Sequence, residues 1–260
     1  MMVNVNINVL GCPYAGAPFM KGKDMEVNVK TTRLENSDNN IKGLATMTIG
    51  NAFKVQSISI VEGKNGLFVS MPSYKSKHQD EQGNDVFKDI CNPITREFRE
   101  DMNKAILDSF GSGEEKSFGS PDGKDFPDYN VKVTPLANSG NTVGIAKIYF
   151  GDDFIVSNIS IKKTGEGKLF ASMPSFKTSQ VDENGKPVYK DIAFPSTKEF
   201  NNQLQKDILI AYHEAVRSKE RDSKSIQDRL SEGQSRSADT LVFGMNDRSM
   251  ADPVRDTVLA

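Results

Sequence analysis

The sequence contains its own near copy. The stretch LFVSMPSYK at residues 67–75 returns as LFASMPSFK at residues 169–177. Matching segments follow in the same order in both copies, with VFKDI at residues 86–90 and VYKDI at residues 188–192. A period of about 100 residues is the size of a domain, so it indicates duplication of a whole domain and not a solenoid. Any structural prediction for one copy therefore applies to the other.

Each copy begins with a pattern typical of an antiparallel sheet. Residues 28–34 and 43–49 are strand candidates, and the second of them alternates apolar and polar side chains as a half-buried strand does. Gly50 and Asn51 then predict a tight turn into a third strand at residues 53–61. Within that strand the apolar positions change parity, which predicts a bulge or burial on both faces. The repeated LFVSM run is a further buried strand that stops at a proline.

Each copy ends in a pattern typical of an amphipathic helix. Thr95 is the predicted N-cap of the first helix. Apolar residues follow at a period of 3.6 in both copies, at Phe98, Met102, Ala105, Ile106 and Phe110, and at Phe200, Leu204, Ile208, Ala211 and Tyr212. The sequence therefore predicts an α+β fold of two tandem repeats, each an antiparallel β-sheet followed by a C-terminal amphipathic helix.

Composition sets the predicted boundaries of five segments. The two domains occupy residues 27–110 and 128–216, and a partly irregular leader precedes them. Residues 111–127 are rich in Gly, Ser, Asp and Lys, as a flexible linker is. Residues 217–260 are charged and predicted to be mostly disordered, apart from a helical extension to about residue 230. The apolar cluster at residues 241–243 is interpreted as part of a frayed tail, with a docking peptide as the alternative.

Charge and cysteine content limit the class of protein. The 33 basic and 35 acidic side chains give a net charge of −2, so no global cationic field attracts nucleic acid or anionic membrane. The two cysteines are Cys12 and Cys91, and Ala193 stands at the counterpart of Cys91 in the second copy. This pattern argues against a disulfide framework and fits a reducing cytosol. No apolar run approaches the roughly 20 residues that span a bilayer, so we expect a cytoplasmic protein without membrane contact.

The residues that usually carry catalysis give no matching pattern. His78 and His213 are the only histidines, and neither recurs in the other copy. No metal-ligand motif or cofactor fingerprint is present in the sequence, so we expect no metal, no cofactor and no catalytic residue. Asp89 and Asp191 recur just before the helix, where we interpret them as turn or cap acceptors and not as acid–base catalysts. The chain is thus not predicted to be an enzyme.

The candidate binding residues directly follow the repeated strand. They combine lysines with aromatic neighbours, which can contact phosphates and stack on bases. The alternative is that they are core aromatics beside lysines whose stems lie on the surface. The predicted nucleic-acid-binding set is Ser73, Tyr74, Lys75, Lys77, Ser175, Phe176 and Lys177.

These elements together resemble the SpoVG (septation protein) family of bacteria. The resemblance rests on NGLFVSMPS, a hydrophilic segment with Gly, then F/Y-K-D-I, a proline and a terminal helix, and it covers about residues 29–110 and 131–212. It implies small cytoplasmic α+β proteins that form dimers and act as nucleic-acid-binding regulators, in some bacteria tied to septation and sporulation. It implies no enzyme.

The chain departs from the family pattern after MPS. Where the family commonly has two basic residues, this chain has Tyr74-Lys75 and Phe176-Lys177, so an aromatic replaces one charge in each copy. That exchange favours base stacking or protein contacts over duplex phosphate contacts.

Two hypotheses follow. In the first, the chain is a covalently linked version of the family dimer, an intramolecular pseudo-dimer that presents two copies of the post-MPS segment to DNA or RNA. In the second, it is a protein-interaction or scaffold module, of the kind found on mobile genetic elements, whose tail recruits a protein partner and which binds no nucleic acid.

Overall fold

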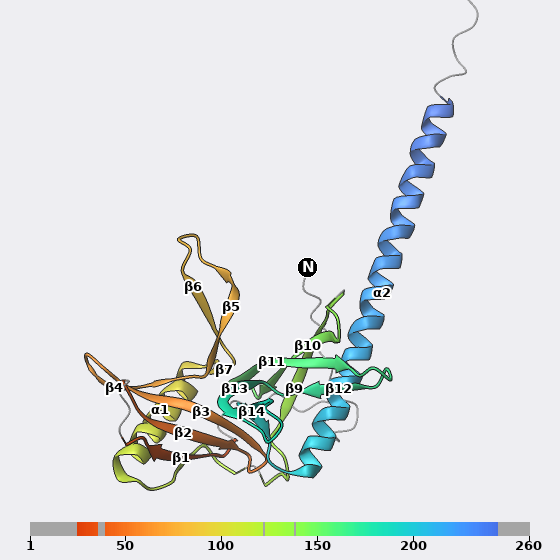
Figure 1. Cartoon of the computed structure of the whole chain (residues 1–260). Helices are drawn as coiled ribbons and strands as arrows, with labels where there is room; N and C mark the ends of the chain where they lie inside the picture. Colours follow the sequence, from red (N-terminus) through yellow and green to blue (C-terminus); the bar gives the residue numbers. More distant parts are fainter. Residues whose placement is uncertain (1–24, 36–39, 122, 138, 244–260) are drawn as a thin grey trace, which may run out of the picture. The chain divides into compact units, whose positions relative to one another are not determined.

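The computed structural model describes residues 25–35, 40–121, 123–137 and 139–243, without the side chains of Lys77 and residues 224–243. The first repeat contains β1 (Val27–Arg33), β2 (Ile41–Ile49), β3 (Phe53–Gly63), β4 (Gly66–Ser70), β5 (Ser73–Gln79), β6 (Asp85–Asp89), β7 (Cys91–Pro93) and α1 (Arg96–Ser112), and β8 (Lys116–Phe118) follows. The second contains β9 (Tyr129–Pro135), β10 (Thr142–Phe150), β11 (Phe154–Lys163), β12 (Leu169–Ser172), β13 (Ser175–Val181), β14 (Pro187–Asp191), β15 (Ala193–Pro195) and α2 (Lys198–Phe243). The predicted α+β fold of two repeats, each a sheet followed by a helix, is confirmed (Figure 1).

The two main sheets exchange short strands. The first sheet has the order β15-β3-β2-β1-β8, with β4 also paired to β3. The second has the order β12-β11-β10-β9, and β7 also pairs with β11. The exchange is reciprocal, because Pro93 and Cys91 lie opposite Phe154 and Val156, while the equivalent Pro195 and Ala193 lie opposite Phe53 and Val55. Each repeat thus supplies a strand that extends the sheet of the other.

A bulge interrupts the long hairpin of each repeat. Pairing between β2 and β3 shifts by one residue after Ala45 and Ile58, and Ser57 has a φ of 64°. In the second repeat the same shift occurs between β10 and β11, and Asn158 has a φ of 63°. An extra residue in a left-handed conformation bends the strand and re-aims the positions beyond it. Of the two explanations predicted for the change of apolar parity, a bulge or burial on both faces, the bulge is present in both copies.

The helices bury the predicted stripes. In α1 the side chain of Thr95 accepts a hydrogen bond from Phe98 N, and the helix ends at Gly113 in the left-handed conformation. The buried residues of α1 include all five predicted, together with Ser109. In α2 the first four predicted residues are buried and Tyr212 is half-buried.

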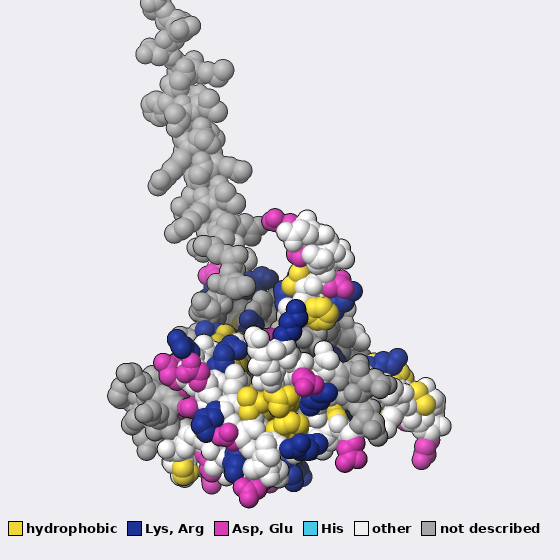
Figure 2. All heavy atoms as spheres, turned by 90° about the vertical axis from the view of Figure 1, so that its left-hand side faces the viewer, with side chains coloured by type: hydrophobic (Ala, Val, Ile, Leu, Met, Phe, Trp, Pro, Cys, Tyr) yellow, Lys and Arg dark blue, Asp and Glu magenta, His cyan; other side chains and the backbone are white. Residues whose placement is uncertain are grey.

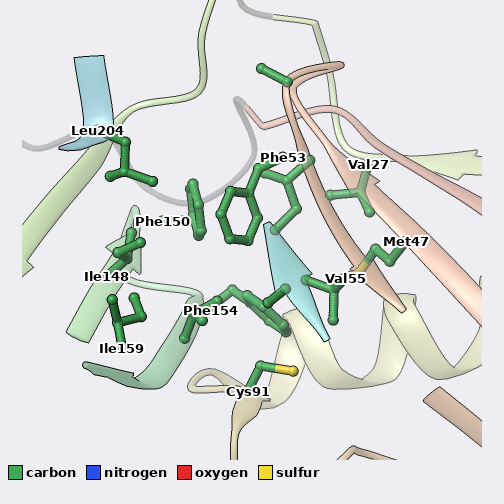
Figure 3. Close-up of a cluster of buried hydrophobic side chains, with 14 of the residues drawn as sticks. Val27, Met47, Phe53, Val55, Cys91, Ile148, Phe150, Phe154, Ile159 and Leu204 are labelled. Carbon is green, nitrogen blue, oxygen red and sulfur yellow. The ribbon is translucent and has the colours of Figure 1, made fainter. Parts of the chain in front are cut away.

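The core is continuous across both repeats (Figure 3). The rings of Phe53 and Phe150 lie 4.8 Å apart, although they belong to different repeats. Phe98 of α1 contacts Phe154 at 5.7 Å, and Phe200 of α2 contacts Phe53 at 6.4 Å. One compact unit extends through Ala215, and the residues from Val216 form a second unit.

Two segments contain more regular structure than their composition indicates. Residues 111–127, expected to be a flexible linker, include the end of α1 and strand β8, which pairs with β1. Phe118 is the apolar anchor of that strand, with its ring 5.2 Å from that of Phe98. In the predicted tail, α2 continues to Phe243, beyond the expected end near residue 230. Its sequence has no proline and is rich in helix-forming residues. Leader residues 1–24 and tail residues 244–260 lie outside the described part of the chain.

Candidate functional site

Two β-hairpins stand apart from the main sheets. Arm one is β5 with β6, and arm two is β13 with β14; each forms a two-stranded sheet of its own. Figure 1 shows arm one extending away from the first sheet. Each arm starts directly after the proline of MPS, because proline lacks the N–H that a central strand needs to continue its ladder. The hydrophilic segment with Gly that follows MPS is therefore a hairpin with an irregular register.

The base of each arm is fixed by the other repeat. Ile90 N donates to Pro72 O at 2.8 Å, which closes arm one. Ile90 O then accepts from Ser157 N, next to the bulge of β11, at 2.6 Å. The equivalent bonds of arm two run from Ile192 N to Pro174 O at 2.7 Å and from Gln56 N to Ile192 O at 2.8 Å. The bulges thus provide a backbone donor to the arm of the opposite repeat.

The arms place aromatic and basic residues opposite one another. In arm one Tyr74 is paired with Lys88, and Lys75 with Phe87. Adjacent residues of a strand point to opposite faces, so each face of the arm carries one aromatic and one lysine. Arm two repeats the arrangement, with Phe176 opposite Lys190 and Lys177 opposite Tyr189.

The aromatic residues on the arms are exposed. Phe87 and Tyr189 have 63% and 61% of their surface accessible, and Tyr74 and Phe176 have 37% and 40%. These values contradict the alternative that the aromatics after MPS are core residues. Exposed aromatic rings beside lysines can stack on bases or pack against a protein partner.

The predicted site residues lie together on the arms. Ser73, Tyr74 and Lys75 are on β5, and Ser175, Phe176 and Lys177 are on β13. Lys77 is also on β5, but its side chain lies outside the described part of the structure. Their role in binding stays a prediction.

Sequence reasoning missed the second half of each arm. Phe87 and Lys88, and the equivalent Tyr189 and Lys190, face the predicted residues across the hairpin. The signal was the aromatic–lysine pair that precedes Asp-Ile in both copies. Its residue types match those of the aromatic–lysine pair on the strand that it faces.

The lysines of the two arms differ in their partners. Lys75 forms an ion pair with Asp85 at 2.6 Å. In arm two Pro187 occupies the position of Asp85, and Lys177 makes no ion pair with any described residue. The second arm therefore presents a less neutralised lysine.

The tips of the arms share one turn. Asp80 N donates to Asn84 O, and the Asp80 carboxylate accepts from the backbone N of Gln82 and Asn84. The side-chain amide of Asn84, together with these backbone donors, lowers the pKa of Asp80 below its usual value. Asp182 makes the equivalent backbone bonds in arm two.

Candidate metal ligands and ionisable side chains are dispersed among the described residues. No group of three or more His, Cys, Asp or Glu side chains there is placed to hold a metal ion. Cys91 is fully buried, and desolvation, with a smaller contribution from Asp89, raises its pKa. Burial likewise raises the pKa of Asp191. Neither Asp89 nor Asp191 caps a helix, since Thr95 and Thr197 do so.

No helix within the described residues combines the length and the apolar character needed to cross a membrane.

Comparison with known proteins gives the same family in both halves. The SpoVG family model matches residues 24–112 and again residues 128–214. A protein named "Putative septation protein SpoVG" from Clostridium perfringens is 37% identical over 86 residues, which are 32% of this chain and 89% of the relative. Proteins of the same name from Caldanaerobacter subterraneus and Treponema denticola are 33% and 35% identical, over 36% and 33% of this chain and 96% and 86% of their own lengths. The chain therefore belongs to the SpoVG family and carries two copies of its domain in tandem.

Proposed function

We propose that the chain is a non-enzymatic, cytoplasmic regulator that binds nucleic acid, DNA or RNA, through its two arms. Its relatives are named as septation proteins, so the regulated process is of the septation or sporulation type. The observation that carries the proposal is the cross-strand pairing of exposed aromatics with lysines, repeated on both arms.

The physical case depends on local and not global charge. Lysine and arginine side chains are interspersed with acidic ones on the face drawn in Figure 2, in keeping with the net charge of −2. Binding therefore needs short-range contacts, with lysines on phosphates and exposed rings on bases. Each arm offers both kinds of contact on both of its faces.

Titration of labelled single-stranded and duplex oligonucleotides tests the proposal. The variant Lys75→Ala/Lys177→Ala removes one lysine from each arm. Its salt dependence should be shallower by about 1.4 for a single strand and 1.8 for a duplex, because two phosphate contacts are lost. The variant Phe87→Ala/Tyr189→Ala should weaken binding without changing that slope.

Lys104→Ala/Lys206→Ala is the matched control. These lysines occupy equivalent exposed positions of α1 and α2, so the total charge changes equally but the arms are intact. Absence of binding by the unaltered chain at low salt would contradict the proposal.

The two repeats are proposed to pair within one chain. The reciprocal pairing of β7 with β11 and of β15 with β3 supports this, since it extends both sheets without a second molecule. Sedimentation at micromolar protein should give a monomer of 28.7 kDa. An obligate dimer of chains would contradict intramolecular pairing.

A protein-interaction or scaffold role is the second candidate. The exposure of Phe87 and Tyr189 above 60% also fits a protein contact. Under this alternative the arm aromatics or the residues from Ser218 onward are needed for partner binding, while the arm lysines are not. Two results together would favour this alternative. The lysine variants would bind a purified protein partner normally, and no form of the chain would bind an oligonucleotide.

A further inference from the structure

The outer face of the second sheet has lysines where the first sheet has Thr46 and Val61, while the first sheet has Lys54 where the second has Ile155. Most inward positions of β9 to β12 are buried and apolar, and α2 lies against this side of the sheet through contacts such as Tyr129 with Asp207. The alternate positions point away from the helix. Three lysines and two aromatics there form what we call the basic face, namely Lys132, Lys147, Tyr149, Lys162 and Phe170.

Strand register arranges these side chains in two groups, because Lys162 pairs with Thr142, five residues before Lys147 on β10 and so about 17 Å along the strand from it. Lys132 of β9 lies directly opposite Lys147 of β10. Lys162 of β11 lies directly opposite Phe170 of β12. The ammonium group of Lys132 sits 4.8 Å from the centre of the Tyr149 ring. The face thus extends over four neighbouring strands, a width of about 14 Å at roughly 4.8 Å per strand.

The charges on the basic face are not balanced by the protein. No acidic residue occupies an outward position of β9 to β12. Lys162 donates to Ser172 Oγ at 3.3 Å, and Lys147 makes no hydrogen bond or ion pair with any described residue. Like charges directly opposite each other on a sheet are destabilising. A bound anion would remove that repulsion between Lys132 and Lys147.

The first repeat provides an internal comparison. The pair equivalent to Lys132 and Lys147 is Lys30 and Thr46. Tyr149, which faces Asn130, corresponds to Thr48, which faces Asn28. Lys162, which faces Phe170, corresponds to Val61, which faces Phe68. The same backbone therefore forms without two of these lysines and the tyrosine, so the fold does not require them.

We propose that the basic face binds single-stranded nucleic acid, with its lysines on phosphates and its aromatics against bases. The inference rests on the proposed nucleic-acid function and adds a second, one-sided surface to the arms. Single strands are favoured over duplexes because the faces of bases are accessible to aromatic rings only when the bases are unstacked. The absence of acidic groups from the outward positions makes the charge complementary to a phosphate backbone.

The test replaces three residues of the basic face by the residues at the equivalent positions of the first repeat. The variant Lys147→Thr/Tyr149→Thr/Lys162→Val carries the residues that already stand at positions 46, 48 and 61. Labelled oligo-dT, oligo-U and a duplex of equal length are titrated at several salt concentrations. Single-strand affinity should fall at least about ten-fold, and the salt slope should be shallower by about 1.4 for the two lysines removed. Duplex affinity should change less than two-fold.

Two further variants complete the design. Lys30→Ala/Lys54→Ala removes two exposed lysines from the first sheet and should leave single-strand affinity within two-fold. Lys147→Glu changes one exposed position, preserves the sheet, and should weaken single-strand binding as the triple variant does.

The outcomes separate this inference from the proposed function. If the unaltered chain binds no oligonucleotide, both fail. If it binds, and the arm variant Lys75→Ala/Lys177→Ala loses affinity while the triple variant and Lys147→Glu keep it, only the basic face is overturned. Equal loss of duplex and single-strand binding by the triple variant would overturn the preference for single strands.

Discussion

Thr95 Oγ1 donates a 2.7 Å hydrogen bond to Oδ1 of Asp153, and the two residues belong to different repeats. Thr95 also caps α1, and Ile94 N donates to Asp153 O at 2.6 Å. Asp153 is 7% exposed, and its carboxylate lies at the positive end of the helix, where an acidic group is stabilising. One residue of the second repeat therefore holds the start of the first helix.

Replacing Asp153 by alanine should destabilise the whole unit. Loss of a charge-assisted bond to the cap should lower the free energy of unfolding by about 1–3 kcal/mol. Urea denaturation followed by circular dichroism measures the change. Asp152→Ala is the control, because Asp152 is exposed and should change stability by less than about 0.5 kcal/mol. Equal effects of the two changes would contradict this role for Asp153.

The two repeats should unfold in a single transition. Phe53 and Phe150 meet across the repeats, and the buried cluster is continuous, so neither half has a separate core. The chain has no tryptophan, which allows Phe118→Trp and Phe126→Trp to report on the two repeats separately. Their fluorescence midpoints should coincide. Phe150→Ala should lower both midpoints together, at a cost of about 3–5 kcal/mol.

Cys91 should make stability fall at alkaline pH. Burial raises its pKa in the folded state, so the unfolded chain loses the thiol proton first, near pH 8.5. Ionisation of this thiol leaves the free energy of unfolding unaffected below that pH and lowers it above that pH, by about 1.4 kcal/mol per pH unit. Cys91→Ala provides the comparison, because Ala193 fills the equivalent position in the second repeat. Parallel stability curves for the two proteins from about pH 9 to about pH 10 would contradict the prediction.

Gln205 should protect the edge of β12. Its side-chain amide accepts from Ala171 N at 2.8 Å and donates to Ala171 O at 2.7 Å. Gln205→Ala should speed amide exchange at Ala171 and lower stability by about 1–3 kcal/mol. Asn103 holds the equivalent position in α1 and makes no hydrogen bond to a described side chain. Asn103→Ala should therefore change neither amide exchange at Ala171 nor the free energy of unfolding.

Local pattern predicted the parts of the fold that depend on near neighbours. The stripe of α1, its cap at Thr95 and the bulge at Ser57 all lie within short windows whose period is visible in the sequence. The exchanged strands were not predicted. Each of β7 and β15 has three residues, too few for a period, and finds its partner in the other repeat.

The candidate site was predicted to a similar extent. The residues after MPS were identified from the repeat, but the register that pairs Tyr74 with Lys88 depends on how the hairpin closes. Lys132 and Lys147 are 15 positions apart in sequence and become neighbours only through strand pairing. Side-chain type indicates chemistry, whereas assembly into a surface depends on contacts between distant segments.

The strand exchange also delays completion of the first sheet during synthesis of the chain. Gln56 Nε2 bonds to Asp191 O, a residue 135 positions later, and β15 follows directly. At about 5–20 residues per second, the ribosome needs roughly 7–27 s to deliver that segment. During this interval β4 pairs with the far end of β3, but the part of the edge at Phe53–Val55 lacks its partner β15, and neighbouring nascent chains on one messenger carry the same open segment. Slow translation of the second repeat should therefore increase pairing between chains at the expense of the single-chain form.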